Sequence, residues 1–338
     1  SLYELMERAG KAVYELALSL AKSAGLAEFV IIAGKGNNAG DAFVCARLLH
    51  KQGCKVSICM THSPDSLKGD AKKAFLSLPD TLKENIAFIL TAEHLQKNAL
   101  FIDGILGIGA QGYPREPAAT WIEMLNAAAN PVLSIDLPSG MNADSDNCEL
   151  AVIADHCISF LTAKKSLLSQ SAAEFCGRIT VADLNISHEL LEEFTSEDEA
   201  FGLRDAQKLL KREHFCTYKN LRGHVAIVGG SRYYAGAPIL SAEASLRSGS
   251  GLCTVFFPKS AELYSSISKA LIVRRIEDSG KGFFNLSSIS EIEEQLKEAS
   301  VIAFGPGLSC NSEMLPFMEM LFALNKAMVL DADALNLL

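Results

Sequence analysis

The chain has 338 residues, of which 49% are hydrophobic, so it is long enough for two domains and supplies apolar residues for two cores. Its formal net charge of -9 argues against binding to nucleic acid or to an anionic membrane, since both need clustered Lys and Arg. No stretch approaches the roughly 18 apolar residues of a membrane span. Nine cysteines without a C-x-x-C pair are typical of reduced thiols in a cytoplasmic protein and argue against structural zinc.

Helices and strands alternate in the first part of the chain, which predicts an α/β domain with a parallel sheet. Apolar residues at helical spacing from Leu2 to Leu20 predict an amphipathic first helix. The other expected helices are residues 42–51, 66–78 and 119–128. The expected strands are residues 29–33, 55–60, 100–103, 132–136, 157–161 and 178–181. Residues 188–200 carry six acids and are expected to form a helix and linker, so we place the end of this domain at residue 202.

A second alternation predicts another α/β domain for residues 203–338. Its expected strands are residues 224–228, 252–257, 301–304 and 328–330, and its expected helix is residues 238–247. The chain starts at Ser1 within a helical pattern and stops at Leu338 within an α/β alternation. We therefore expect a fragment that is truncated at both ends, and the sequence leaves open whether the second domain folds stably.

The most informative run is residues 31–41, an apolar strand that leads into a glycine-rich turn carrying two amides and a carboxylate. Glycines at such a turn allow a ligand to approach the backbone, and the next helix offers free N–H groups. We therefore expect a nucleotide-sized ligand here. The alternative is a polar turn that only caps the helix at residues 42–51.

This run also fits the G-x-G-x-x-G/A dinucleotide fingerprint, which by itself is a weak signal. Two details argue against an ordinary NAD-dependent dehydrogenase. Asp41 would place negative charge where a pyrophosphate binds. The strand at residues 55–60 closes with Thr61 and His62, where that fold carries an acid for the ribose.

Two further loops follow strands of the same expected sheet, at residues 103–113 and 136–140. The first has four glycines within nine residues, so we expect a ligand to lie against its backbone. Asp103 could bind a metal, act as an acid or base, or cap the next segment. Because Asn38, Asp103 and Ser139 offer hard oxygen ligands at neighbouring strand ends, together they suit a monovalent or other hard cation.

These three loops resemble the NAD(P)H-hydrate epimerase family. The matching segments are Gly36-Asn37-Asn38-Ala39-Gly40-Asp41, Asp103-Gly104 and Asp136-Leu137-Pro138-Ser139-Gly140, with Leu5-Met6-Glu7-Arg8-Ala9-Gly10 in the first helix. The resemblance implies a Rossmann-like, three-layer fold for residues 1–202 and bound potassium. It implies as substrate NADH or NADPH that has been hydrated at the nicotinamide ring.

Carried over residue by residue, the resemblance implies a site. Its substrate contacts would be Asn37, Asn38, Ala39, Gly40, Asp41, Gly107, Ile108, Gly109, Ala110, Gln111, Gly112, Tyr113 and Asp136. Potassium would be held by Asn38, Asp103 and Ser139. Asp136 would be the catalytic acid and base. The family usually reads Asn-Asn-Gly-Gly-Asp-Gly where this chain has Ala39 and Ala42. If Ala39 must take positive φ, the strain is of order 1 kcal/mol.

The second domain resembles the ADP-dependent NAD(P)H-hydrate dehydratase family, which has a ribokinase-like fold and commonly follows the epimerase. The matching segments are residues 219–224, 227–231, 235–238, 246–252, 305–308 and 331–336. The resemblance implies that Ala237 and Gly307 line a substrate site and that ADP or ATP, with magnesium, drives the removal of water. The family's later segments, including its catalytic Asp, are expected beyond Leu338, so the ribokinase-like domain is incomplete and this fragment should not dehydrate.

Together, the two resemblances and the composition predict a cytoplasmic enzyme of nicotinamide nucleotide repair. Its substrate would be a small molecule, and no nucleic-acid or membrane partner is expected. The first domain would epimerise the R and S hydrates, and the second would belong to a dehydratase acting on the S form. Two alternatives remain: a sugar-kinase-like phosphotransferase, and a non-catalytic nucleotide-binding protein on the epimerase fold. The preference between NADH and NADPH hydrate and the oligomeric state, a homo-oligomer being one option, are not fixed by the sequence.

Overall fold

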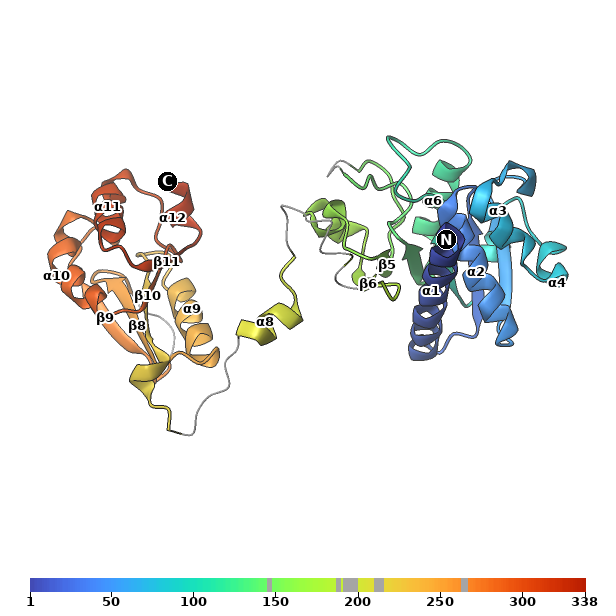
Figure 1. Ribbon diagram of the computed structural model, residues 1–338. Helices are drawn as coiled ribbons and strands as arrows, with labels where there is room; N and C mark the ends of the chain where they lie inside the picture. Colours follow the sequence, from blue (N-terminus) through green and yellow to red (C-terminus); the bar gives the residue numbers. More distant parts are fainter. Residues whose placement is uncertain (145–147, 187–189, 191–199, 210–215, 263–266) are drawn as a thin grey trace. The chain divides into compact units, whose positions relative to one another are not determined.

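The computed structural model describes residues 1–338 apart from 145–147, 187–189, 191–199, 210–215 and 263–266. The chain divides into two compact units, Ser1–Phe201 and Gly202–Leu338 (Figure 1). Most of the predicted helix and linker at residues 188–200 lies outside the described residues. Among the helices that are described, none combines the length and hydrophobicity needed to cross a membrane.

The first unit is built on a six-stranded, fully parallel sheet, as predicted. Its strands are β1 (Glu28–Ala33), β2 (Lys55–Met60), β3 (Ala99–Gly104), β4 (Val132–Ile135), β5 (His156–Phe160) and β6 (Arg178–Ala182). Their order, β2-β1-β3-β4-β5-β6, reverses its direction of winding between β1 and β3. In sheets of this kind, ligands bind beyond the carboxyl ends of the strands at that reversal.

Helices cover both faces of this sheet, which makes the unit three-layered. Alternate residues of β1 point to opposite faces, so Ile31 packs into one apolar cluster and Ile32 into another. The first cluster contains the inner faces of α1 (Leu2–Ala24), α2 (Asn37–Lys51) and α3 (Gly69–Leu76), and the second that of α6 (Ala118–Ala127). A 3-10 helix η1 (Pro64–Ser66) and the short helices α4 (Asp80–Lys83) and α5 (Ala92–Leu95) are the other described helices before β3. The α/β class and the layers predicted for this unit are confirmed.

Helix α2 begins five residues before the predicted position, at Asn37 instead of residue 42. Gly36 is its N-cap residue, in an extended conformation with φ −93° and ψ −170°. The glycine-rich run therefore forms the first turns of a helix, where Ala39 needs no positive φ. The condition for strain at Ala39 is therefore not met. Because Ala has the highest helix propensity, Ala39 and Ala42 favour this helix relative to glycine.

The second unit contains a five-stranded parallel sheet in the order β11-β10-β7-β8-β9. Its strands are β7 (His224–Val228), β8 (Leu252–Pro258), β9 (Ile272–Ile276), β10 (Val301–Phe304) and β11 (Ala327–Leu330). Its described helices are α8 (Leu203–Leu209), α9 (Gly236–Arg247), α10 (Leu286–Lys297), α11 (Leu315–Ala323) and α12 (Asp333–Asn336). Strand β9 was not predicted because it is an edge strand whose central Arg274 and Arg275 are exposed, so it lacks an apolar run.

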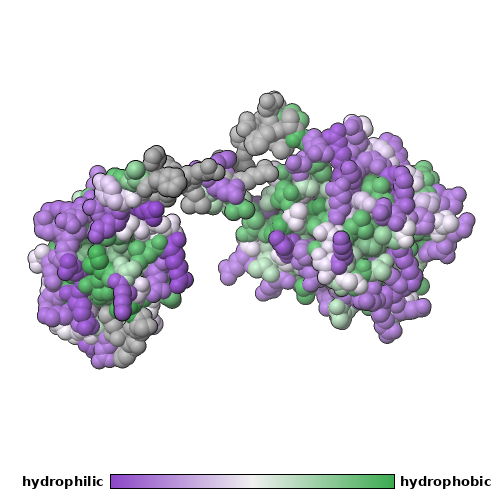
Figure 2. Space-filling model, turned by 90° about the horizontal axis from the view of Figure 1, so that it is seen from below, coloured by the Kyte–Doolittle hydropathy of each residue, from purple (hydrophilic) through white to green (hydrophobic). Residues whose placement is uncertain are grey.

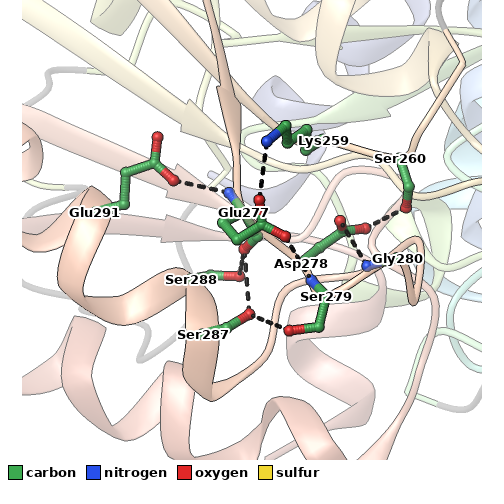
Figure 3. A network of polar contacts seen from close by, with 9 residues as sticks. All are labelled: Lys259, Ser260, Glu277, Asp278, Ser279, Gly280, Ser287, Ser288 and Glu291. Atoms are coloured by element: carbon green, nitrogen blue, oxygen red, sulfur yellow. Dashed lines mark hydrogen bonds and ion pairs between the residues drawn. The ribbon is translucent and has the colours of Figure 1, made fainter.

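A polar network fixes the loop between β9 and α10 (Figure 3). The Lys259 ammonium group pairs with Glu277 at 3.0 Å, and the Glu277 backbone N–H donates to the Glu291 carboxylate at 2.8 Å. The Ser288 hydroxyl donates to the Glu277 carbonyl at 2.7 Å. Asp278, which is only 1% exposed, accepts from the Ser260 hydroxyl and from backbone N–H groups of its own loop. The network joins the ends of β8 and β9 to the first turn of α10.

Both units expose apolar as well as polar side chains. Figure 2 shows one face of each unit, on which hydrophilic residues predominate and smaller apolar areas remain. Scattered apolar exposure of this kind is normal for a folded protein surface.

The contact between α1 and α2 gives a stability prediction. A Cβ added to Gly10 would lie 2.4 Å from the Cβ of Val44 and 2.7 Å from the Asp41 carbonyl oxygen. Gly10→Ala should therefore lower the free energy of unfolding by about 1–3 kcal/mol through overpacking, despite the gain in helix propensity. Trp121 is the only tryptophan and is buried in α6, so its fluorescence during urea unfolding reports on this unit. Lys11→Ala, on the exposed face of α1, is the control, and equal or greater stability of Gly10→Ala would contradict the packing.

Candidate active site

A cavity of about 530 Å³ lies at the carboxyl ends of the strands of the first unit. The turn after β1 contributes Gly34, Lys35 and Gly36, and the first turns of α2 contribute Asn37, Asn38 and Asp41. Thr61 and His62 follow β2, residues 105–110 follow β3, and Asp136 follows β4. Ala118 begins α6. The cavity thus lies where the winding of the sheet reverses, between β1 and β3.

The inner wall of this cavity is made of backbone packed on backbone. A Cβ added to Gly34 would lie 1.9 Å from the carbonyl oxygen of Ile105, so only glycine fits at this position. A Cβ on Gly107 would lie 3.2 Å from the Cβ of Asn38. The two glycine-rich loops therefore contact each other directly and form one continuous surface.

The structure brings most, but not all, of the predicted substrate contacts to this cavity. Those that line it are Asn37, Asn38, Asp41, Gly107, Ile108, Gly109, Ala110 and Asp136. Ala39 and Gly40 instead face the core: Ala39 is fully buried, and Gly40 packs on the side chain of Met6. Gly112 and Tyr113 line a separate cavity of about 190 Å³ together with Gly140. Gln111 lines neither of the two cavities.

Asp103 is fully buried at the end of β3, and its carboxylate is held by two loops. It accepts hydrogen bonds from the Ser134 hydroxyl at 2.8 Å, from the Ser139 N–H at 2.9 Å and hydroxyl at 2.5 Å, and from the Ile105 N–H at 3.2 Å. Burial raises the pKa of Asp103 above its ordinary value, although these hydrogen bonds act in the opposite direction. Asp103 therefore joins the loop after β3 to the loop after β4.

The side chain of Asn38 has a buried oxygen that bears on the expected cation site. Its side-chain Nδ2 donates to the Leu106 carbonyl oxygen at 2.6 Å, while its Oδ1 is buried and has no hydrogen-bond partner among the described residues. The Ser139 hydroxyl also lies 3.2 Å from the same Leu106 oxygen. An unsatisfied buried acceptor is costly, and a cation bound between these oxygens would satisfy it. Asn38, Asp103 and Ser139 therefore fit a hard cation.

Asp136 faces the cavity on a constrained backbone, and its carboxylate forms an ion pair that the sequence did not predict. Its φ of 64° lies in the left-handed region, and its N–H donates to the Ile158 carbonyl at 2.7 Å. Its carboxylate pairs with the ammonium group of Lys164, which also donates to the Phe160 carbonyl at 3.1 Å. The one signal that could have indicated Lys164 is its position just after β5, the neighbour of β4.

Asp41 is the second carboxyl group of the cavity and lies in a different environment. Burial, and next the negative charge of Asp136, hold the pKa of Asp41 well above its ordinary range. No hydrogen bond or ion pair is made by this side chain within the described part of the chain. The cavity therefore combines an ion-paired carboxylate with a carboxyl group that favours its protonated form.

The end of β2 supplies two more residues that were not predicted to line the site. The Thr61 hydroxyl lies 2.8 Å from Nδ1 of His62. Burial and the nearby Lys35 ammonium group lower the pKa of His62, which favours the neutral imidazole. These side chains extend the polar lining of the cavity towards the sheet edge.

In the second unit, the two predicted substrate contacts lie next to each other. Gly307 has φ +66°, and a Cβ there would lie 2.5 Å from the Tyr234 carbonyl oxygen and 3.4 Å from the Cβ of Ala237. The Ser309 hydroxyl donates to that of Ser231 at 2.8 Å, which joins the loops after β10 and β7. These two strands are neighbours at the reversal of winding of the second sheet.

The buried carboxyl of Asp41 gives a prediction for the pH dependence of stability. Its pKa is higher in the folded than in the unfolded state, so the stability that its proton contributes is present below about pH 3.9 and is lost as pH rises through the folded pKa. The amide side chain of Asp41→Asn has no such proton to lose. The unfolding free energy of this variant minus that of wild type should therefore increase by at least about 1 kcal/mol from pH 4 to pH 8. Urea unfolding followed by Trp121 fluorescence measures it.

The control is Asp80→Asn, since the Asp80 side chain is 86% exposed. Its stability difference from wild type should not change with pH. A difference between Asp41→Asn and wild type that is equally independent of pH would contradict the environment described for Asp41.

Comparisons with known proteins agree with this two-part organisation. Residues 2–166 match the family described as "YjeF-related protein N-terminus", and residues 225–338 match the family described as "NAD(P)H-hydrate dehydratase". A yeast crystal structure, ynu0, is 23% identical with a TM-score of 0.48, covering 61% of this chain and 88% of that one.

Curated relatives match along the whole chain. The bifunctional NAD(P)H-hydrate repair enzyme Nnr of Coxiella burnetii is 30% identical over 341 residues, covering 100% of this chain and 67% of the relative. The protein of the same name from Escherichia coli K12 is 30% identical over 344 residues, covering 100% and 63%. The chain thus spans about two thirds of the length of these relatives. It belongs to the family of bifunctional NAD(P)H-hydrate repair enzymes.

Proposed function

We propose that the cavity of the first unit interconverts the R and S hydrates of NADH and NADPH. The observation that carries this proposal is the placement of Asp136: its carboxylate faces a cavity whose walls are the two glycine-rich loops, beside Asn38, Asp103 and Ser139. The loops supply backbone surface for a nucleotide, and Asp136 supplies a group that can move a proton. Membership of the repair-enzyme family supports the same substrate.

The chemistry needs only one proton carrier, because the hydrate is a hemiaminal. A carboxylic acid protonates the hydroxyl group, the carbon–oxygen bond breaks, and water leaves as the lone pair of the ring nitrogen forms an iminium. The carboxylate that remains then takes a proton from water as that water adds to either face of the ring. Proton and water are both returned, so no redox cofactor is consumed. We assign this acid and base role to Asp136.

We propose that potassium is held by Asn38, Asp103 and Ser139, with the unpartnered Asn38 Oδ1 as the main support. When bound, potassium supplies positive charge next to the acidic strand ends. Asn38 lies on the first turn of α2, and Asp103 and Ser139 fix the loops after β3 and β4. These three residues therefore hold the loops that form the walls of the cavity in fixed positions relative to one another.

We further propose that residues 203–338 form the first part of a dehydratase domain that uses ADP or ATP with magnesium. The contact of Gly307 with Tyr234 and Ala237 supports a substrate site at that sheet reversal. Residues 1–202 then form the epimerase domain. A cytoplasmic location is supported by the nine cysteines, all of which are free thiols.

The role of Asp136 is tested by Asp136→Asn with purified R and S NADPH hydrates. The amide cannot donate and accept the proton in turn, so epimerisation should slow by at least about 100-fold. Chiral separation of the two hydrates over time measures the rate. Asp80→Asn, which removes an exposed carboxylate, should behave like wild type. Unchanged turnover in Asp136→Asn would remove this residue from the mechanism, and hydrate binding without turnover in the wild type would favour a non-catalytic binding protein.

The cation site is tested by Ser139→Ala. We expect the potassium concentration for half-maximal epimerisation to rise by about tenfold or more, since the variant loses an oxygen ligand and a donor to Asp103. Titration with potassium chloride, with choline chloride holding the ionic strength constant, measures it. Ser23→Ala, on the exposed part of α1, is the control. Wild-type epimerisation that does not respond to potassium would reject the cation site.

A further inference from the structure

We propose that Lys164 is a positioning residue for the reaction of the first unit, whose ammonium group holds the carboxyl group of Asp136 at the cavity wall. This inference rests on the proposed function and adds to it a residue outside the matching motifs. Lys164 acts through Asp136, and it does not line the cavity itself.

The contacts of Lys164 restrict both its own position and that of Asp136. Its ammonium group donates to Oδ1 of Asp136 and, at 3.1 Å, to the carbonyl oxygen of Phe160, the last residue of β5. The Lys164 side chain is 18% exposed and that of Asp136 is 12% exposed. The pair is therefore largely shielded from water, where a long side chain is held in one place and screening by salt is weak.

The backbone of Asp136 is fixed from the same strand. Its N–H donates to the Ile158 carbonyl at 2.7 Å, and its own carbonyl lies 3.6 Å from the thiol of Cys157. With φ at 64°, the residue is in a conformation that non-glycine residues rarely adopt. Strand β5 thus sets the backbone of Asp136, and Lys164, just beyond the end of β5, sets its carboxylate. Together they give the side chain one direction, which is towards the cavity.

The charges around Asp136 explain why a cation is needed there. Asp41, on α2, faces the same cavity and interacts unfavourably with it, while Cys157, on β5, is buried and neutral. Lys164 is the only cation that pairs with Asp136 in the described part of the chain. Of these two carboxyl groups, that of Asp136 has a cationic partner, whereas that of Asp41 makes no ion pair among the described residues. Lys164 therefore fixes the position of one of the two carboxyl groups of the cavity and not that of the other.

A buried ion pair by itself is weak support for a role in stability, because desolvating two charges costs about as much as their attraction returns. The position of this pair at the cavity wall points instead to the reaction. A structural role and a positioning role predict different kinetics, and this difference forms the test.

The experiment compares Lys164→Met, Lys164→Gln and Lys164→Arg in epimerisation of NADPH hydrate. Met and Gln remove the charge, so kcat should fall at least 30-fold while KM changes less than threefold. Arg keeps the charge, so the kcat of Lys164→Arg should be at least tenfold higher than that of Lys164→Met. Lys55→Met, which breaks the exposed pair with Glu28, is the matched control and should keep wild-type kinetics.

Trp121 fluorescence shows which variants are folded, and Lys164→Gln, which keeps polarity and length, decides the question if Lys164→Met does not fold. Folded charge-removed variants with kcat within threefold of wild type would overturn the proposal while leaving the proposed function standing. Arg behaving no better than Met would overturn it as well. Failure of the wild-type chain to epimerise the hydrate would instead reject the proposed function.

Discussion

Asp103 lies near the end of a strand in the middle of the first sheet, where its carboxylate is buried and accepts three hydrogen bonds from two loops and one from Ser134 on β4. Transferring a charged carboxylate from water to the protein interior is costly unless its lone pairs accept hydrogen bonds. The loops after β3 and β4 must therefore adopt conformations that bring their N–H and hydroxyl groups to this carboxylate. The positions of Leu106, Ser139 and Asp136 follow from that requirement.

Three carboxyl groups lie at this edge of the sheet, and they differ in their bonding partners. Asp103 is stabilised by hydrogen bonds, Asp136 by an ion pair, and Asp41 by neither. Burial raises the pKa of Asp41 and of Asp103, while Asp136 is paired with a cation, so similar groups occupy different environments at one edge of the sheet. The orphaned Asn38 Oδ1 adds an acceptor at the same edge, so the site concentrates oxygen atoms without a matching number of donors.

Much of the architecture could be predicted from the sequence, because buried parallel strands such as β1 and β3 are short apolar runs that end at or just before a glycine. The start of α2 could not, since glycine and asparagine favour turns in isolation and the helix is selected by packing of Gly40 and Ala39 against the core. The pairing of Lys164 with Asp136 depends on two chain segments meeting only in the folded sheet. No local pattern marks such a contact.

The carbonyl oxygen of Ile105, against which Gly34 packs, also limits how this cavity could be redesigned. At Gly34 its inner wall is main chain on both sides, so no side-chain substitution can enlarge it there. Room exists at the outer wall, where Ile108 is 56% exposed and a Cβ on Gly109 would meet nothing within 4 Å. Directed evolution towards a bulkier or differently shaped nucleotide would therefore have to work through residues 108–110, while the floor of the cavity stays invariant.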